Sequence, residues 1–150
     1  MHRKRRDFLT LVSVMAAAGL LPAGLARAEA WNKAAFGAKN MDDLLKVLGA
    51  GAPQLSTDVV LVAPEIAENG AVVPIEIESK LVDTQSIAIL IEKNPNILTA
   101  IFEIPSGTLP WLQTRVKMAE TCNVYVLVKA SGKFFYAAKE IKVTLGGCGG

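Results

Sequence analysis

The stretch that decides the fold is Val72-Val73-Pro74-Ile75-Glu76-Ile77-Glu78-Ser79. Its odd-numbered positions from 73 to 77 are aliphatic, and its even-numbered positions from 74 to 78 are proline or glutamate. A period of two is typical of a β-strand with one buried and one solvated face. Pro74 has no backbone N–H to donate, so we expect this strand to lie at the edge of a sheet.

Strand patterns of the same kind recur on both sides of this stretch. With residues 72–79, the pattern predicts seven strands, the others at residues 59–63, 86–92, 98–104, 112–118, 123–129 and 134–145. Turn-forming residues separate them, among them Asn94-Pro95-Asn96 and Ala130-Ser131-Gly132. No helical pattern intervenes, so the sequence predicts an antiparallel β-sandwich.

One strand is apolar on both faces, because Ile87-Ala88-Ile89-Leu90-Ile91 contains no polar residue. An apolar face left open to solvent favours aggregation. We therefore expect a partner chain to cover one face of the sandwich.

The segment before the strands has helical spacing from Trp31 to Leu48, and Asn40 is a suitable N-cap for a helix starting near Met41. Two pairs of acidic residues, Asp42-Asp43 and Glu76-x-Glu78, are conceivable as a carboxylate site. A first-turn helix pair and the solvated face of a strand are the better interpretations.

Residues 1–28 have the order of an export signal: basic residues at positions 3–6, an apolar stretch from 8 to 25, and the cleavage motif Ala26-Arg27-Ala28. Cleavage after Ala30 is the alternative to cleavage after Ala28. A membrane anchor is the competing interpretation, but Gly19, Pro22 and Gly24 interrupt the run.

The pair Arg5-Arg6 with Phe8 and Leu9 resembles a twin-arginine leader. Lys4 and Thr10 depart from the usual pattern, so the general export system is the alternative route. Both routes lead to the periplasm. The expected domains are therefore a signal peptide (1–28), a β-sandwich (29–145) and a C-terminal arm (146–150).

Composition excludes several classes of function. Without residues 1–28 the chain keeps 11 basic and 13 acidic residues, a net charge of about −2 that argues against nucleic acid or an anionic membrane as partner. Its only histidine is His2, which lies in the leader. No histidine-based catalytic or metal site is then available, and two cysteines cannot hold zinc or an iron–sulfur cluster. We expect no metal, no cofactor and no enzymatic activity.

The chemistry of the chain is concentrated in its last five residues, Gly146-Gly147-Cys148-Gly149-Gly150. Glycine has no Cβ, so the four glycines predict a flexible arm that leaves the sulfur of Cys148 unshielded. The arm contains no group that would activate the thiol, so activation must come from a protein that the arm enters. The alternatives are a structural disulfide between Cys122 and Cys148, or a tail that is merely disordered.

With its twin-arginine leader and histidine-free β domain, the chain resembles the SoxY family of sulfur carriers. The other matching segments are the strand 72–77, the turn 94–96 and the ending Lys142-Val143-Thr144-Leu145-Gly146-Gly147-Cys148-Gly149-Gly150. The resemblance implies an immunoglobulin-like sandwich that pairs with a second small β protein, SoxZ, and carries sulfur intermediates covalently on Cys148. It assigns no role to Cys122.

The resemblance also implies three enzymes that visit the arm in turn. A c-type haem enzyme, SoxAX, joins thiosulfate to the cysteine, and a manganese hydrolase, SoxB, releases sulfate. The alternatives for the remaining sulfur are oxidation by a sulfane dehydrogenase, SoxCD, and storage as sulfur globules. The carrier itself catalyses none of these steps. Competing hypotheses are a periplasmic thiol oxidoreductase, weakened by the missing C-x-x-C motif, and a binding module with an incidental tail.

Overall fold

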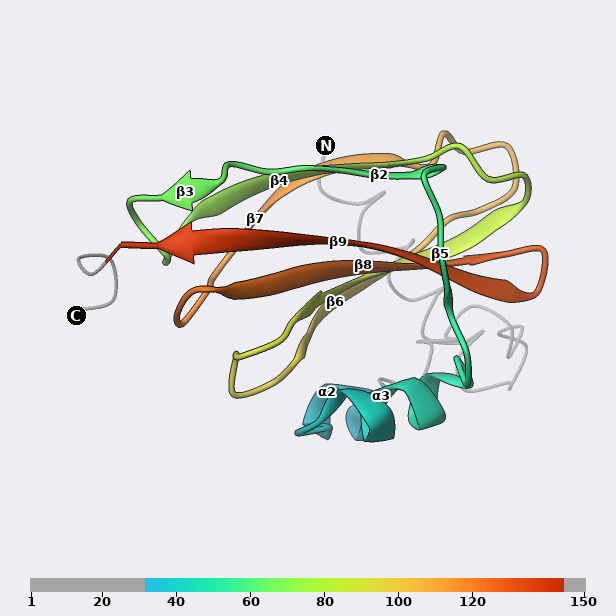
Figure 1. Ribbon diagram of the computed structural model, residues 1–150. Helices are drawn as coiled ribbons and strands as arrows, with labels where there is room; N and C mark the ends of the chain where they lie inside the picture. Colours follow the sequence, from blue (N-terminus) through green and yellow to red (C-terminus); the bar gives the residue numbers. More distant parts are fainter. Residues whose placement is uncertain (1–31, 145–150) are drawn as a thin grey trace, which may run out of the picture. The chain divides into compact units, whose positions relative to one another are not determined.

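The computed structural model describes residues 32–144 of the chain. The expected signal peptide and the cysteine arm therefore lie outside the described residues. Within residues 32–144, two short helices precede nine strands (Figure 1). The elements are α2 (Lys33–Gly37), α3 (Met41–Leu48), β1 (Gln54–Leu55), β2 (Val59–Val62), β3 (Ile66–Ala67), β4 (Val73–Ser79), β5 (Thr84–Ile91), β6 (Leu98–Glu103), β7 (Trp111–Val116), β8 (Cys122–Ala130) and β9 (Lys133–Val143).

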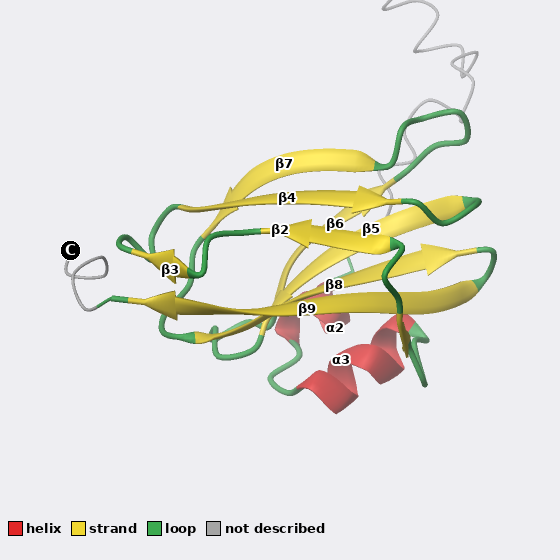
Figure 2. Cartoon of the chain, turned by 45° about the horizontal axis from the view of Figure 1, so that its top comes forward, coloured by secondary structure: helices red, strands yellow, loops and turns green. Residues whose placement is uncertain are grey.

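The strands form two sheets that face each other (Figure 2). The larger sheet has the order β1-β9-β8-β5-β6, with β3 also paired to β9, and the smaller one has the order β2-β4-β7. All seven predicted strands are present, each with ends within two residues of the prediction. The predicted immunoglobulin-like sandwich is confirmed. The short strands β1 and β3 were not predicted, and both pair with β9 in parallel.

The core between the sheets is almost entirely aliphatic. Alternate residues of the central strands point into it, as their period of two predicts. The members with the largest fully buried side chains are Ile75, Ile77, Ile87, Ile89, Ile91, Met118 and Ile141. Each fully buried isoleucine contributes about 1.5–3 kcal/mol, so this layer supplies most of the driving force for folding.

The apolar second face of β5 is covered by this chain itself. Ala88 and Leu90 point away from the sandwich core and pack in a separate cluster with Leu44 of α3 and Ala35 of α2. The two apolar faces of β5 are therefore no evidence for a partner chain, and this reason for expecting one is wrong. The helices α2 and α3 supply the missing layer, because their own apolar residues need the same burial.

Local capping explains where the helices begin and end. The side chain of Asn32 accepts a hydrogen bond from the N–H of Ala35, and the side chain of Asn40 accepts one from Asp43, as predicted for Asn40. Gly49 ends α3 in the left-handed conformation with a φ of 71°. Asp42 and Asp43 occupy the first turn of α3, which confirms the structural interpretation of this acidic pair. Within residues 32–144, no helix has the length and apolar character to span a membrane.

The prediction that Pro74 marks an edge strand is wrong, since β4 is the central strand of the smaller sheet. The register explains how the proline is tolerated. The pairing of β2 with β4 extends only to Glu76, whereas β7 continues to pair with β4 at Pro74. Pro74 therefore has a neighbouring strand on one side only, and its missing N–H costs no hydrogen bond if it faces the open side.

Replacing Leu44 with alanine tests the helical cover. Leu44 is fully buried against the outer face of the larger sheet, so the variant should lower the free energy of unfolding by about 2–4 kcal/mol. Val47 lies in the same helix and is 44% exposed, so Val47→Ala should change it by less than about 0.5 kcal/mol. Urea denaturation measures both. Equal losses in the two variants would show that α3 does not pack as described.

Candidate functional site

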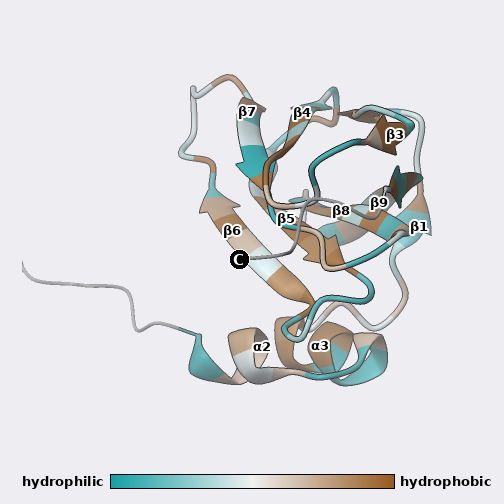
Figure 3. Ribbon diagram, turned by 90° about the vertical axis from the view of Figure 1, so that its left-hand side faces the viewer, coloured by the Kyte–Doolittle hydropathy of each residue, from teal (hydrophilic) through white to brown (hydrophobic). Residues whose placement is uncertain are grey.

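The residues expected to carry the function, Cys148 and the glycines Gly146, Gly147, Gly149 and Gly150, all lie outside the described residues. The structure instead describes the place where the arm begins. We call Lys142, Val143 and Thr144, the last three described residues, the arm root. Figure 3 views this end of the sandwich, with β3 and the end of β9 facing the reader.

The outer edge of the arm root is paired with β3. The backbone N–H of Lys142 donates to the carbonyl oxygen of Glu65 at 2.9 Å, and the N–H of Thr144 donates to that of Ala67 at 3.1 Å. In this parallel register, Ile66 lies opposite Lys142. The two-residue strand β3 therefore fixes the arm root, the last part of the chain before the arm.

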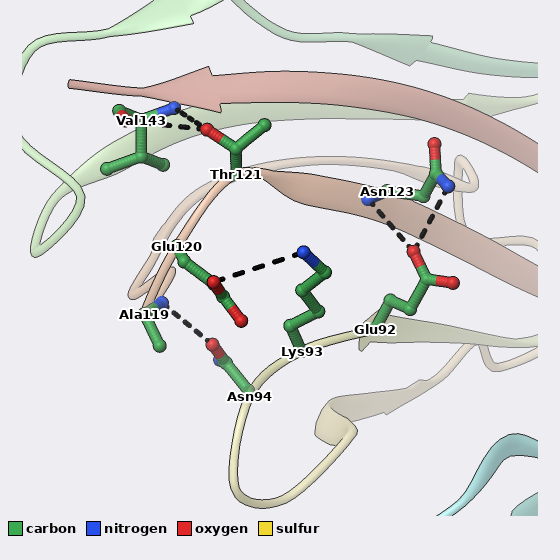
Figure 4. Close-up of polar contacts among 8 residues, drawn as sticks. All are labelled: Glu92, Lys93, Asn94, Ala119, Glu120, Thr121, Asn123 and Val143. Carbon is green, nitrogen blue, oxygen red and sulfur yellow. Dashed lines mark hydrogen bonds and ion pairs between the residues drawn. The ribbon is translucent and has the colours of Figure 1, made fainter.

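The other edge of the arm root is held by a side chain. The hydroxyl of Thr121 accepts a hydrogen bond from the N–H of Val143 at 2.9 Å and lies 3.4 Å from its carbonyl oxygen (Figure 4). Thr121 directly precedes β8, so its hydroxyl continues the β8–β9 ladder by one position. The arm root is thus fixed on both sides.

Two polar side chains, Asn94 and Glu92, connect the segments that lie beside the arm root. Asn94, in the turn after β5, donates to the carbonyl of Lys117 at 2.7 Å and accepts from the N–H of Ala119 at 3.0 Å. A carboxylate oxygen of Glu92 accepts from the backbone and the side chain of Asn123 (Figure 4). These bonds connect the β5–β6 turn to the loop before β8, which carries Thr121.

Cys122 is buried at the start of β8 with 4% of its surface exposed, and it forms no disulfide with any described residue. Burial raises the pKa of its thiol, and the backbone hydrogen bond from Lys93 offsets this only in part. A protonated, shielded thiol is a poor nucleophile. The interpretation of Cys122 as a small buried apolar residue is confirmed.

A groove, but no cluster of potential metal ligands, is found among the described residues. No group of three or more potential ligand side chains lies together in residues 32–144. A groove of about 270 Å³ lies between α3 and the outer face of the larger sheet, lined by Met41, Leu45, Pro53, Leu90, Tyr125, Leu127 and Tyr136. This lining is apolar apart from the hydroxyl groups of the two tyrosines.

Comparison with known proteins identifies one family. The family model described as "Sulfur oxidation protein SoxY" matches residues 44–148, a range that includes Cys148. The solved structure of the sulfur carrier protein SoxY from Chlorobium limicola f thiosulfatophilum is 36% identical, with a TM-score of 0.64. The match covers 75% of this chain and 99% of that one. Among curated proteins no match was found.

A second solved structure shares the fold alone. Superoxide reductase (neelaredoxin) E23A from Ignicoccus hospitalis has a TM-score of 0.51 at 15% identity, covering 66% of this chain and 87% of that chain. At this identity the likeness reports a common sandwich architecture and carries no argument about activity.

The burial of Cys122 predicts a thiol that does not react in the folded protein. In a Cys148→Ser background, alkylation of Cys122 by iodoacetamide at pH 8 should be at least about 100-fold slower in buffer than in denaturing urea. Because the pKa of this thiol is raised on folding, the unfolded thiol ionises first. Its contribution therefore lowers the free energy of unfolding as pH rises above the ordinary thiol pKa. Equal alkylation rates in buffer and in urea would contradict the buried placement.

Proposed function

This chain belongs to the SoxY family of sulfur oxidation proteins, and we propose that it is a sulfur carrier that holds its cargo covalently on Cys148. The observation that carries the proposal is that the family match extends through Cys148. The only other cysteine, Cys122, is buried and shielded. The carrier is not itself an enzyme, because the arm has no residue that would activate its thiol.

The first step forms a sulfur–sulfur bond. The thiol of Cys148 and the outer sulfur of thiosulfate join to give a cysteine S-thiosulfonate. This bond formation releases two electrons, and the thiol gives up its proton. A SoxAX-like c-type haem enzyme accepts the electrons, so the oxidant is external to the carrier.

The second step is a hydrolysis. One water attacks the terminal sulfonate, and the sulfur–sulfur bond to it breaks. Sulfate leaves together with two protons, while a persulfide anion stays on Cys148. A SoxB-like manganese hydrolase performs this step. A SoxCD-like dehydrogenase then oxidises the outer persulfide sulfur to a sulfonate, which takes up three water molecules and releases six electrons and six protons. A second hydrolysis returns the free thiol.

The disulfide alternative is disfavoured by the position of Cys122. Its side chain belongs to the core between the sheets. A bond from Cys122 to Cys148 would require the buried sulfur to leave this core, at the cost of a cavity. The same burial argues against Cys122 as the attachment site.

The working form is proposed to be a periplasmic heterodimer with a SoxZ-like β protein. The twin-arginine motif Arg5-Arg6 supports export in the folded state. In the oxidising periplasm, an exposed thiol without cargo tends to form disulfides. A carrier thiol that enzymes repeatedly load and regenerate would spend less time in this exposed state.

Replacing Cys148 with serine should abolish thiosulfate-dependent electron transfer in a reconstituted system, because a hydroxyl cannot form the sulfur–sulfur bond. Mass spectrometry of wild-type protein from its host should show sulfur-oxyanion or persulfide adducts on the peptide containing Cys148. The matched control is Cys122→Ser, which should keep full activity and lose about 1–2 kcal/mol of unfolding free energy. Activity in Cys148→Ser, or adducts on Cys122, would refute the assignment.

Valine at positions 147 and 149 tests whether the arm requires glycine. The double variant Gly147→Val, Gly149→Val keeps the thiol but adds β-branched side chains that stiffen and widen the chain. We expect each enzymatic step to slow by about 10-fold or more, while alkylation of Cys148 by iodoacetamide changes by less than about threefold. Wild-type turnover in this variant would show that the glycines are incidental.

A further inference from the structure

We infer that the segment from Val62 to Val72, whose middle part (Glu65 to Glu68) is hydrogen-bonded to the arm root, is a docking surface for a processing enzyme. The enzyme would contact it with the rim of the channel that receives the arm. The inference rests on the proposed carrier function. It concerns a transient contact on the sandwich, separate from the arm itself.

The first step of the argument is the length of the tether. Thr144 is held by β3, and Val143 is held by Thr121, so the chain is fixed in place as far as Thr144. Cys148 follows Thr144 by four residues, and four residues reach at most about 14 Å. A channel that admits the sulfur must therefore open within that distance of the arm root.

The second step is the composition of the nearby surface. Eight large apolar side chains are exposed in residues 32–144, and three of them fall in this eleven-residue segment. Val62 is 55% exposed, Ile66 is 58% exposed and Val72 is 48% exposed. Ile66 lies opposite Lys142 of the arm root, and β3 is coloured as hydrophobic in Figure 3.

The third step concerns the kind of partner. Isolated exposed aliphatic residues are common, but a concentration beside the departure point of a functional arm is typical of a contact surface. Permanent interfaces usually engage 20–30 residues a side. A segment of three apolar side chains suits a weak contact, which a carrier needs if it is to leave one enzyme for the next. The occupant is therefore an enzyme whose channel rim offers an apolar surface.

Charge substitution at Ile66 tests the inference. With full-length carrier and the purified haem enzyme that loads thiosulfate, Ile66→Glu should lower kcat/KM for the carrier by about 10-fold, which corresponds to about 1.4 kcal/mol. The kcat at saturating carrier should change by less than about twofold. Alkylation of Cys148 by iodoacetamide should be unchanged, because the arm itself is intact.

The matched control is Val82→Glu. Val82 is 84% exposed, and its carbonyl oxygen accepts a hydrogen bond from Ser131. Ser131 lies in the turn before β9, at the opposite end of that strand from the arm root. This variant should behave as wild type. Val72→Glu offers a second test on the segment in case Ile66→Glu weakens the β3 pairing.

Three outcomes would overturn the inference. They are equal kinetics in Ile66→Glu and Val82→Glu, a change in kcat alone, and loss of binding to the SoxZ-like protein in Ile66→Glu, which would assign the segment to the permanent partner. Failure of the carrier function itself is recognised separately, because Cys148→Ser would then retain activity.

Discussion

The burial of β5 on both of its faces is the constraint on which the rest of the structure depends. Ile87, Ile89 and Ile91 fill the core between the sheets, and Ala88 and Leu90 pack under the helices. β5 therefore needs an apolar layer on each of its faces. The smaller sheet covers one face and the two helices cover the other. This explains why a small β domain keeps a helical segment, and it places the larger sheet in the middle of three layers (Figure 2).

Long elements with a clear period were predictable from the sequence, and short ones were not. The seven strands with alternating residues were found because each contains at least four residues of pattern. β1 and β3 have two residues each, and two residues have no period. The cover of β5 was misassigned for a related reason. Sequence shows that a strand and a helix each need an apolar neighbour, but not that they meet each other.

In the candidate site, too, features that depend on local sequence could be predicted, and features that depend on strand pairing could not. The role proposed for Cys148 rests on local composition, namely a thiol among glycines, and it stays a prediction because this residue lies outside the described residues. The anchoring of the arm root was not predictable. Thr121 resembles any threonine near a turn, and its contact with Val143 exists only because of the register between β8 and β9. The position of Ile66 beside the arm root likewise depends on the pairing of β3 with the end of β9.

The placement of the arm root at the end of β9 has a mechanical consequence. β9 is an eleven-residue strand, paired with β8 through nine positions on one side and with β1 and β3 on the other. A force applied at Thr144 along the axis of β9 would load many of these hydrogen bonds in shear at once, instead of opening them one at a time. For the proposed carrier, the force needed to withdraw the arm from an enzyme would then be borne by the whole length of β9 instead of by its last residues.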